Sequence, residues 1–97
     1  MDINMIMRQA QKMQADLKKT QSKLEATIYE GESNGIKIQI NGKCECQSIT
    51  IPEELMDDRE MLQDMLLIAF NNAVSKCDED RENQLGGFTA GLNLPGM

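Results

Sequence analysis

The 97-residue sequence has no histidine and no tryptophan, and its three aromatic residues are Tyr29, Phe70 and Phe88. Without histidine, the ordinary Ser/His and Cys/His nucleophile systems are excluded, and the commonest metal ligand is missing. Acidic residues are numerous, but most of them fall where a helix surface would carry them. We therefore expect no enzymatic activity, no catalytic residue, no cofactor and no small-molecule substrate.

Cysteine is also scarce. Cys44, Cys46 and Cys77 are an odd number without the spacing of a disulfide framework, which indicates a reducing cytoplasm. Two thiols spaced as Cys44-x-Cys46 could hold a soft metal ion, but zinc sites usually combine such a pair with a second pair of ligands. Thiols that pack as small apolar side chains are the simpler interpretation, so we expect no metal site.

Long apolar runs are missing as well. No segment reaches the about 18 consecutive apolar residues of a membrane-spanning helix, and no signal peptide is recognisable. With so few aromatic residues, packing depends on eight methionines and on leucine and isoleucine, and methionine specifies a core loosely. A chain of this length buries only roughly 60–65% of its surface. These features favour one cytoplasmic domain, without membrane association, that depends on an oligomer.

The sequence does contain a long, uninterrupted helical pattern from about Ile3 to Thr27. Neither glycine nor proline interrupts this segment, and Asp2 is placed to cap it. Its apolar face follows a heptad spacing with one polar member: Ile3, Ile6, Ala10, Met13, Leu17, Thr20 and Leu24. One helix cannot bury such a seam against itself. We expect the seam to meet the following sheet and another subunit, with the outer half of the helix projecting.

The opposite side of this helix is basic. At ~100° per residue, Arg8, Lys12, Lys19 and Lys23 cluster away from the apolar seam. Residues 1–27 carry five basic and three acidic side chains, whereas residues 28–97 carry five basic and thirteen acidic ones, within a net charge of −6. This basic stripe is either an edge that contacts phosphate groups or a solvated surface that keeps the chain soluble.

Three strands are expected after the first helix. Ile28 to Ser33 is a short strand, and Asn34-Gly35 indicates a turn. Isoleucines then alternate with polar residues from Ile36 to Ile40, which is typical of a half-buried strand. Asn41-Gly42 is the strongest hairpin signal in the chain, and it predicts a third strand from Lys43 to Ile51.

The third strand does not follow one alternating period, because Cys44 and Cys46 share one parity and Ile49 and Ile51 share the other. A β-bulge near Gln47-Ser48 would place all four on the buried face. That arrangement requires Cys44 beside Ile40 and a loop longer than two residues. The alternative is an unbroken strand whose cysteines face outward.

A second long helix is expected from about Arg59 to Glu82. Pro52 ends the strand, residues 52–55 form one turn, and Asp57 lies three residues before Glu60, as in a capping box. The apolar stripe of this helix is wider than one contact needs, so one side can cover the sheet while the other meets a partner chain. Glycine becomes frequent from Gly86. This composition predicts a single domain at residues 1–85 and a flexible tail at residues 86–97.

The order of these segments resembles the YbaB/EbfC family of bacterial nucleoid-associated proteins. The similarity runs from Met5 to Gly96 and rests on three features in combination: Gln9 to Gln14, Asn41-Gly42-Lys43, and Ala69-Phe70-Asn71 followed by the glycine-rich end. It implies an α+β protomer of order α-β-β-β-α, with a long N-terminal helix, a three-stranded antiparallel sheet and a second long helix. It also implies an intertwined, tweezer-like homodimer whose projecting helices grip double-stranded DNA.

The resemblance also implies the site residues. The projecting basic positions are expected to contact DNA: Arg8, Lys12, Lys18, Lys19 and Lys23. Lys76 and Arg81 are weaker additions to this set. The homodimer is expected to form on the apolar face of the second helix, at Leu62, Met65, Leu66, Ala69, Phe70 and Ala73.

The function implied is that of a cytoplasmic protein of the nucleoid. It would bind double-stranded DNA weakly, largely without sequence specificity, and would organise the nucleoid or modulate gene expression. The acidic end of the second helix, Asp78 to Glu82, departs from family members that often carry lysines near the positions of Gln84 and Phe88. The alternative is a protein–protein adaptor or scaffold dimer with little or no DNA binding, in which the basic stripe is only solvated surface.

Overall fold

A computed structural model describes the backbone of residues 2–92 and the side chains of residues 2–86. Helix α1 (Ile3–Ala26) is followed by strands β1 (Tyr29–Ser33), β2 (Ile36–Ile40) and β3 (Cys46–Thr50), the short 3-10 helix η1 (Glu53–Asp57) and helix α2 (Arg59–Leu92). The strands form one antiparallel sheet in the order β1-β2-β3. The expected α-β-β-β-α order is confirmed.

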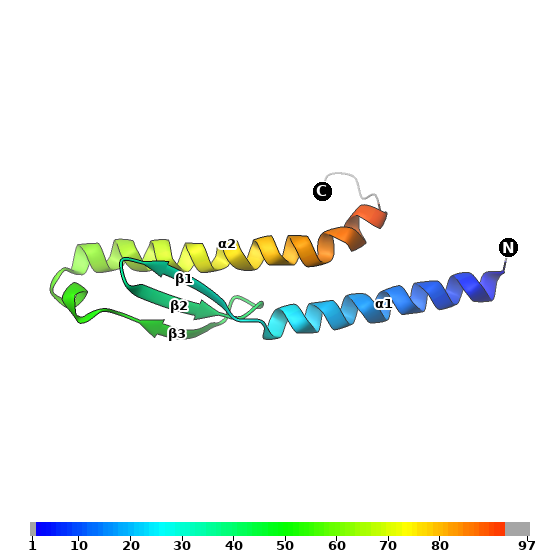
Figure 1. Ribbon diagram of the computed structural model, residues 1–97, viewed down its shortest axis with the longest axis horizontal. Coiled ribbons are helices and arrows are strands. Elements are labelled where there is room, and N and C mark those ends of the chain that lie inside the picture. The colour runs from blue at the N-terminus through cyan, green and yellow to red at the C-terminus, as the bar shows by residue number, and fades with distance from the viewer. Residues whose placement is uncertain (1, 93–97) are drawn as a thin grey trace.

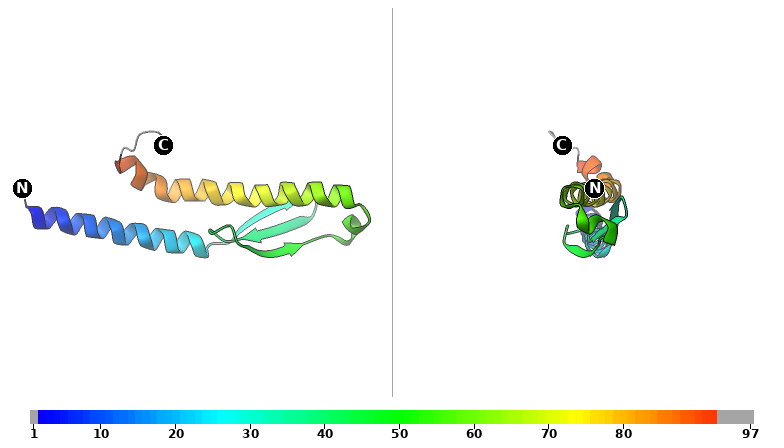
Figure 2. Two further views of the ribbon diagram at one scale, coloured as in Figure 1. Left: turned by 180° about the vertical axis from the view of Figure 1, so that it is seen from behind. Right: turned by 90° about the vertical axis from the view of Figure 1, so that its left-hand side faces the viewer.

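The molecule is long and thin. It measures 70 × 26 × 13 Å, and its radius of gyration of 19.1 Å exceeds the about 13 Å of a compact domain of this size. Helix α2 lies along one face of the sheet, whereas α1 leaves the end of the sheet and extends away from it (Figure 1). The later turns of α2 extend past the same end of the sheet from which α1 leaves, as Figure 1 and the left view of Figure 2 show.

The two hairpin connections differ. Asn34 (φ 48°) and Gly35 (φ 90°) form a tight two-residue turn between β1 and β2, and positive φ at both positions is what a type I′ turn requires. The Asn41-Gly42 signal instead begins a longer loop. Asn41 folds this loop, because its side-chain oxygen accepts hydrogen bonds from the backbone N–H groups of Lys43 (2.9 Å) and Glu45 (3.0 Å).

The predicted bulge is present, but its consequence for burial is not. Gln39 pairs with Ser48 and Ile40 pairs with Cys46, so Gln47 is the extra residue in β3. We expected Cys44 to lie beside Ile40, but this is wrong, because the residue paired with Ile40 is Cys46, two positions further along the chain. The expected burial is wrong as well, because α2 packs on β1 and β2 but does not reach β3. The four side chains therefore stay exposed: Cys44, Cys46, Ile49 and Ile51.

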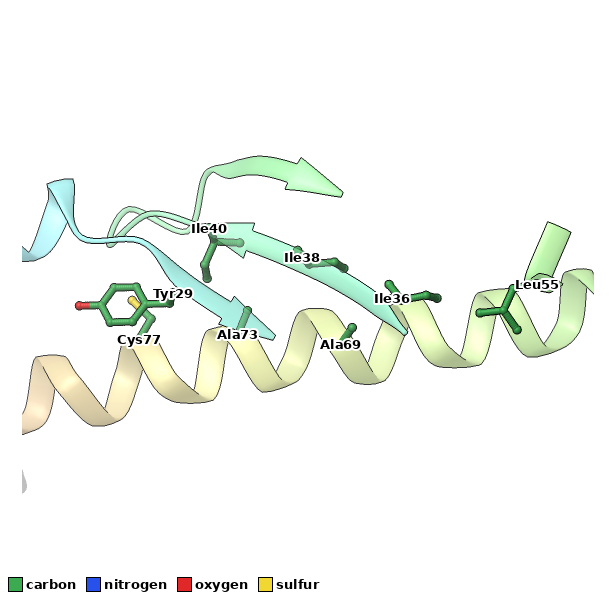
Figure 3. Packing of buried hydrophobic residues seen from close by; sticks show 8 residues of the cluster. All are labelled: Tyr29, Ile36, Ile38, Ile40, Leu55, Ala69, Ala73 and Cys77. Atoms are coloured by element: carbon green, nitrogen blue, oxygen red, sulfur yellow. The ribbon is translucent and has the colours of Figure 1, made fainter. Parts of the chain in front are cut away.

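The core lies between α2 and the first two strands (Figure 3). Its buried members are Tyr29, Ile36, Ile38, Ile40, Leu55, Ala69, Ala73 and Cys77. Small residues allow a close approach of helix and strand. A Cβ atom at Gly31 would collide with the carbonyl oxygen of Ala69 and would lie 2.5 Å from the backbone nitrogen of Ala73. The absence of a side chain at Gly31 is therefore a packing requirement.

Side chains of α2 also cover the free edge of β1. The Lys76 ammonium donates to the Glu30 carbonyl (2.7 Å), and the Asn72 amide donates to the Glu32 carbonyl (3.1 Å). Near the end of the sheet, the Tyr29 hydroxyl donates to the Asp80 carboxylate at 2.6 Å. Backbone groups that an edge strand would otherwise leave open are thus hydrogen bonded within the chain.

The ends of α2 differ from the expected ones. Asp58, and not Asp57, caps the helix, because its side chain accepts from the Met61 N–H at 3.1 Å. The expected end near Glu82 is wrong, since the helix continues to Leu92. Glycine disfavours a helix by about 1 kcal/mol per residue but does not remove its backbone hydrogen bonds. The helix thus includes the first part of the segment predicted as a flexible tail, and residues 93–97 lie outside the described residues.

Candidate nucleic-acid interface

Helix α1 is an exposed arm attached at one end. Leu24 in its last turns is the only buried side chain among its described residues, and Leu17 and Thr20 are half-buried. The outer seam is open to solvent, with Ile3 71% exposed. The cap predicted at Asp2 is present, because the Asn4 N–H donates to the Asp2 side chain at 3.0 Å. At the other end of the helix, the Thr27 hydroxyl donates to the Lys23 carbonyl at 2.7 Å.

All five predicted basic positions lie on this arm, and all of them are exposed: Arg8, Lys12, Lys18, Lys19 and Lys23. Arg8 and Lys23 are about 22 Å apart along the helix at 1.5 Å per residue. Lys18 lies about 100° around the helix from Lys19, so it broadens the stripe rather than extending it. The arm therefore presents positive charge over several turns.

These five cationic groups are not neutralised by any described side chain of the protomer. Between residues 2 and 86, none of their charged groups forms an ion pair or a hydrogen bond. The two ion pairs of that range lie elsewhere, between Lys43 and Glu25 (3.9 Å) and between Arg81 and Asp78 (3.6 Å). Asp16 is the acidic neighbour of the stripe, and it forms no ion pair with any other described residue. The stripe is available to an anionic partner.

The two weaker additions are placed differently. Lys76 is held by the Glu30 carbonyl at 2.7 Å, and Arg81 donates to the Gly42 carbonyl and pairs with Asp78. Both side chains connect α2 to the body of the protomer. The structure therefore does not bring them together with the basic stripe of α1.

The base of the arm is fixed by the loop between β2 and β3. Gly42 packs directly on the backbone of Leu24, and a Cβ atom there would collide with the Leu24 carbonyl. Arg81 reaches the same loop from α2. Around this junction lies a cleft of about 350 Å³ lined by Gln21, Leu24, Glu25, Gly42, Lys43, Arg81 and Leu85. The loop therefore joins both helices where they leave the sheet.

The predicted dimer residues divide into three groups by their burial in the protomer. Ala69 and Ala73 are fully buried against the protomer's own strands, so these two positions have no surface left for a partner. Leu62, Met65 and Leu66 are partly buried against the same core. Phe70 alone among the six stays mainly outside it, at 37% exposed.

Other exposed apolar residues of α2 and the β3 segment, which the site prediction did not include, are Leu67, Ile68, Ile49 and Ile51. At ~100° per residue, Leu67 and Phe70 lie on the flank of α2 opposite Asn72 and Lys76, which cover β1. That flank faces the side of β2 and β3. The exposure of Ile68 could be predicted from the sequence, because the apolar stripe of α2 is wider than one contact needs. The exposure of Ile49 and Ile51 could not, because no local signal in the sequence shows that α2 does not reach β3.

The remaining chemistry is limited. Among residues 2–86, no three histidine, cysteine, aspartate or glutamate side chains gather as a metal site would require. No helix in the described part of the chain is long and apolar enough to cross a membrane.

Burial, and then the hydrogen bond to Asp80, raises the pKa of Tyr29 to about 12. This tyrosine is a neutral structural donor at physiological pH.

Comparisons with other proteins agree with this architecture. The model of the YbaB/EbfC DNA-binding family matches residues 1–92. A nucleoid-associated protein of Clostridium novyi is 43% identical over 101 residues, covering 100% of this chain and 89% of the relative. One of Rickettsia prowazekii is 40% identical over 98 residues, covering 97% and 92%. The crystal structure of an uncharacterized protein from Helicobacter pylori shows the same fold, with a TM-score of 0.76 and 24% identity over 92% of this chain and 98% of that one.

Proposed function

The chain belongs to the YbaB/EbfC DNA-binding family, and we propose that it acts as a homodimer that binds double-stranded DNA through phosphate contacts along α1. Its place in the cell would be the nucleoid in the cytoplasm, where it would organise DNA or modulate gene expression. Its relatives named nucleoid-associated proteins support this placement. The observation that carries the proposal is the set of five exposed cationic side chains on α1 that no carboxylate of residues 2–86 neutralises.

The chemistry of the arm favours contacts with phosphate groups over contacts with base edges. Four of the five cations are lysines, which act as point charges, whereas bidentate recognition of guanine depends mainly on arginine. Each lysine that neutralises a phosphate releases a counterion, so affinity depends steeply on salt. The net charge of −6 opposes a strong general attraction to DNA. We therefore expect weak binding with little sequence preference.

A homodimer is supported by the amount of surface that one protomer leaves open. The chain exposes 7518 Å², whereas a compact monomer of this length would expose about 5,600 Å². Exposed apolar side chains lie on the α1 seam, on β3 and on the β3 side of α2, at Ile6, Met13, Ile49, Leu67 and Phe70. Two copies that bury these surfaces would present two basic arms to one duplex.

The test is a salt titration of binding to a random-sequence duplex, with the oligomeric state followed by light scattering. If each of two arms contributes about three phosphate contacts, the slope of log K against log salt is about −5. Lys19→Glu should weaken binding at every sequence and reduce the magnitude of the slope by about 2, one contact per arm. Reversing Arg8, Lys12, Lys19 and Lys23 together should abolish binding while the dimer persists.

Lys37→Glu is the matched control. Lys37 is also an exposed lysine, its ammonium group has no partner among the described side chains, and it lies on β2 away from the arm. The change in net charge is identical to that of Lys19→Glu, so a general charge effect would weaken both variants equally. Equal losses would contradict the assignment to α1. A stable dimer without binding at low salt would instead favour the second candidate function, an adaptor that uses its exposed apolar surfaces.

A further inference from the structure

The direction of the basic arm is set where α1 joins the body of the protomer. Leu24 is the only buried side chain among the described residues of α1, and a single apolar anchor leaves a helix free to pivot. The cleft of about 350 Å³ at this junction shows that side chains do not fill the space around that anchor. Among the described helices and strands, α2 is the only one that α1 approaches. The contacts that fix the direction of α1 therefore come from α2 and from the β2–β3 loop.

The β2–β3 loop touches the backbone of α1. A Cβ atom at Gly42 would collide with the Leu24 carbonyl, so the two backbones are in direct contact. The loop is also braced internally, because the Asn41 side-chain oxygen accepts hydrogen bonds from the N–H groups of Lys43 (2.9 Å) and Glu45 (3.0 Å). A loop braced in this way moves as one unit, so the side chain that holds the loop also holds the base of α1.

The side chain that holds the loop is Arg81 of α2. Its guanidinium donates to the Gly42 carbonyl, and hydrogen bonds from a charged donor are the stronger kind. The Cys77 thiol reaches the same carbonyl only at 3.8 Å. The ion pair between Lys43 and Glu25 spans 3.9 Å, with both side chains more than half exposed, and such surface pairs contribute little. Arg81 is thus the main polar link from α2 to the loop.

We propose, on the basis of the DNA-binding function proposed above, that Arg81 is a positioning residue for that binding. It fixes the direction of α1 through the Gly42 carbonyl and does not itself contact phosphate groups. Its guanidinium is already hydrogen bonded and ion paired within the chain, whereas the five cations of the stripe have no such partner among residues 2–86.

The length of the arm makes its direction important. The 24 residues of α1 span about 36 Å at 1.5 Å per residue. A tilt of about 10° at the base would move the tip by about 6 Å, more than the rise per nucleotide along one DNA strand of about 3.4 Å. An arm that pivots loses this freedom when it binds, whereas a fixed arm is preorganised. Loss of Arg81 should therefore weaken binding without removing a phosphate contact.

The experiment compares Arg81→Ala with Arg59→Ala in the salt titration against a random-sequence duplex, with the dimer checked by light scattering. Arg59 is the matched control: an exposed arginine of α2 that forms no ion pair with another described residue. It lies about 33 Å along the helix from Arg81, at the end away from the arm (Figure 1). Arg81→Ala should bind about tenfold more weakly at every salt concentration with the wild-type slope. Arg59→Ala should bind within about twofold of wild type.

Arg81→Lys separates position from charge. Lysine keeps the charge, but it lacks the fork with which the guanidinium reaches the Gly42 carbonyl and the Asp78 carboxylate together. This variant should still lose about threefold or more in affinity, again with an unchanged slope. Wild-type binding by Arg81→Lys would overturn the proposal. So would a slope whose magnitude falls by about 2 in Arg81→Ala, because that change is the sign of one direct phosphate contact per arm.

A measurement without DNA tests the same contact. Amide hydrogen exchange of residues 21–26, at the base of the arm, should be at least about fivefold faster in Arg81→Ala than in Arg59→Ala. Equal exchange in the two variants would overturn positioning through the loop. Absence of DNA binding by the wild-type chain would instead overturn the proposed function, so the two failures are distinguishable.

Discussion

The two long helices have similar amphipathic sequence patterns, but α1 is mostly exposed whereas α2 packs on the sheet. Helix α1 has 24 residues and a heptad seam, yet it buries only Leu24 among its described side chains. Helix α2 has 34 residues and buries Ala69, Ala73 and Cys77 against the sheet. The difference lies in what each helix meets, because small residues on α2 let β1 approach closely, while no side chain of residues 2–86 covers the outer half of α1.

This contrast separates stability from binding. The core between α2 and the sheet should set the free energy of unfolding, since burial is the main favourable contribution to folding. The outer turns of α1 should contribute little to it and should tolerate changes that the body does not. The following predictions test that separation, beginning with the largest effect.

Gly31→Ala should lower the free energy of unfolding by at least about 4 kcal/mol, because the new methyl group would collide with backbone atoms of α2 on both sides of the contact. Denaturation followed by circular dichroism measures the loss. Gly86→Ala is the matched control, since a Cβ atom there meets nothing within 4 Å. It should gain about 0.5–1 kcal/mol from helix propensity. A similar loss in both variants would contradict the close packing of β1 on α2.

Ile38→Ala should cost about 3 kcal/mol, because Ile38 is fully within the core and its loss leaves a cavity. The same change at Ile6, on the open seam of α1, should cost less than about 0.5 kcal/mol in a dilute protomer. Urea unfolding of both variants over a range of protein concentrations distinguishes two outcomes. A loss at Ile6 that grows with protein concentration would show that a second copy covers the seam of α1.

Raising the pH tests the attachment of β1 to α2. The pKa of Tyr29 is raised to about 12 in the folded chain, mainly by burial, whereas an unfolded tyrosine has a pKa of about 10. The folded state therefore holds the proton more tightly. Its stabilising contribution is complete below about pH 10 and is lost as the pH rises toward 12, by up to about 2–3 kcal/mol.

Tyr29→Phe should remove this part of the pH dependence, because the variant has no phenol to ionise at that position. Unfolding free energies of both proteins between about pH 9 and pH 12 provide the comparison. Lysines that titrate in the same range are present in both proteins and cancel. An unchanged slope in the variant would mean that the buried hydroxyl is not the cause.

The two helix caps should give the smallest effects and the sharpest contrast. Asp58→Ala removes the acceptor for the Met61 N–H of α2 and should cost about 1 kcal/mol of global stability. Asp2→Ala removes the acceptor for the Asn4 N–H of α1. It should only increase hydrogen exchange in the first turn, because that end can open without the core. Equal global losses would show that α1 unfolds together with the body.

Much of the fold could be predicted from local patterns. The start of α1, its cap at Asp2, the turn at Asn34-Gly35 and the bulge at Gln47 all depend on residues close in sequence. The predictions were wrong where two neighbouring residues could fill the same role, or where a local sequence signal did not fix the length of a loop or helix. Asp58 took the capping role expected of Asp57, Asn41-Gly42 began a longer loop, and α2 continued through glycines that disfavour a helix but leave its backbone hydrogen bonds possible.

The candidate site divides in the same way. The five basic positions of α1 were predicted from helical spacing and from the family resemblance, and the structure shows them exposed. The interface prediction could not separate residues that pack on the chain's own sheet from those left open. Helical spacing shows which side chains of α2 share a face, but it does not show how wide a sheet that face covers.

The sequence by itself determined the two amphipathic helices, the order of the strands and the basic stripe, because each depends on interactions within a few turns or across one short connection. Only the tertiary structure decided that α2 covers β1 and β2 but not β3, that Ala69 and Ala73 belong to the core, and that the Cys77 thiol lies against the Gly42 carbonyl. These outcomes depend on contacts between residues 30 or more positions apart. Such contacts follow from how closely whole elements can approach, and a packing requirement such as the missing side chain at Gly31 has no local signature.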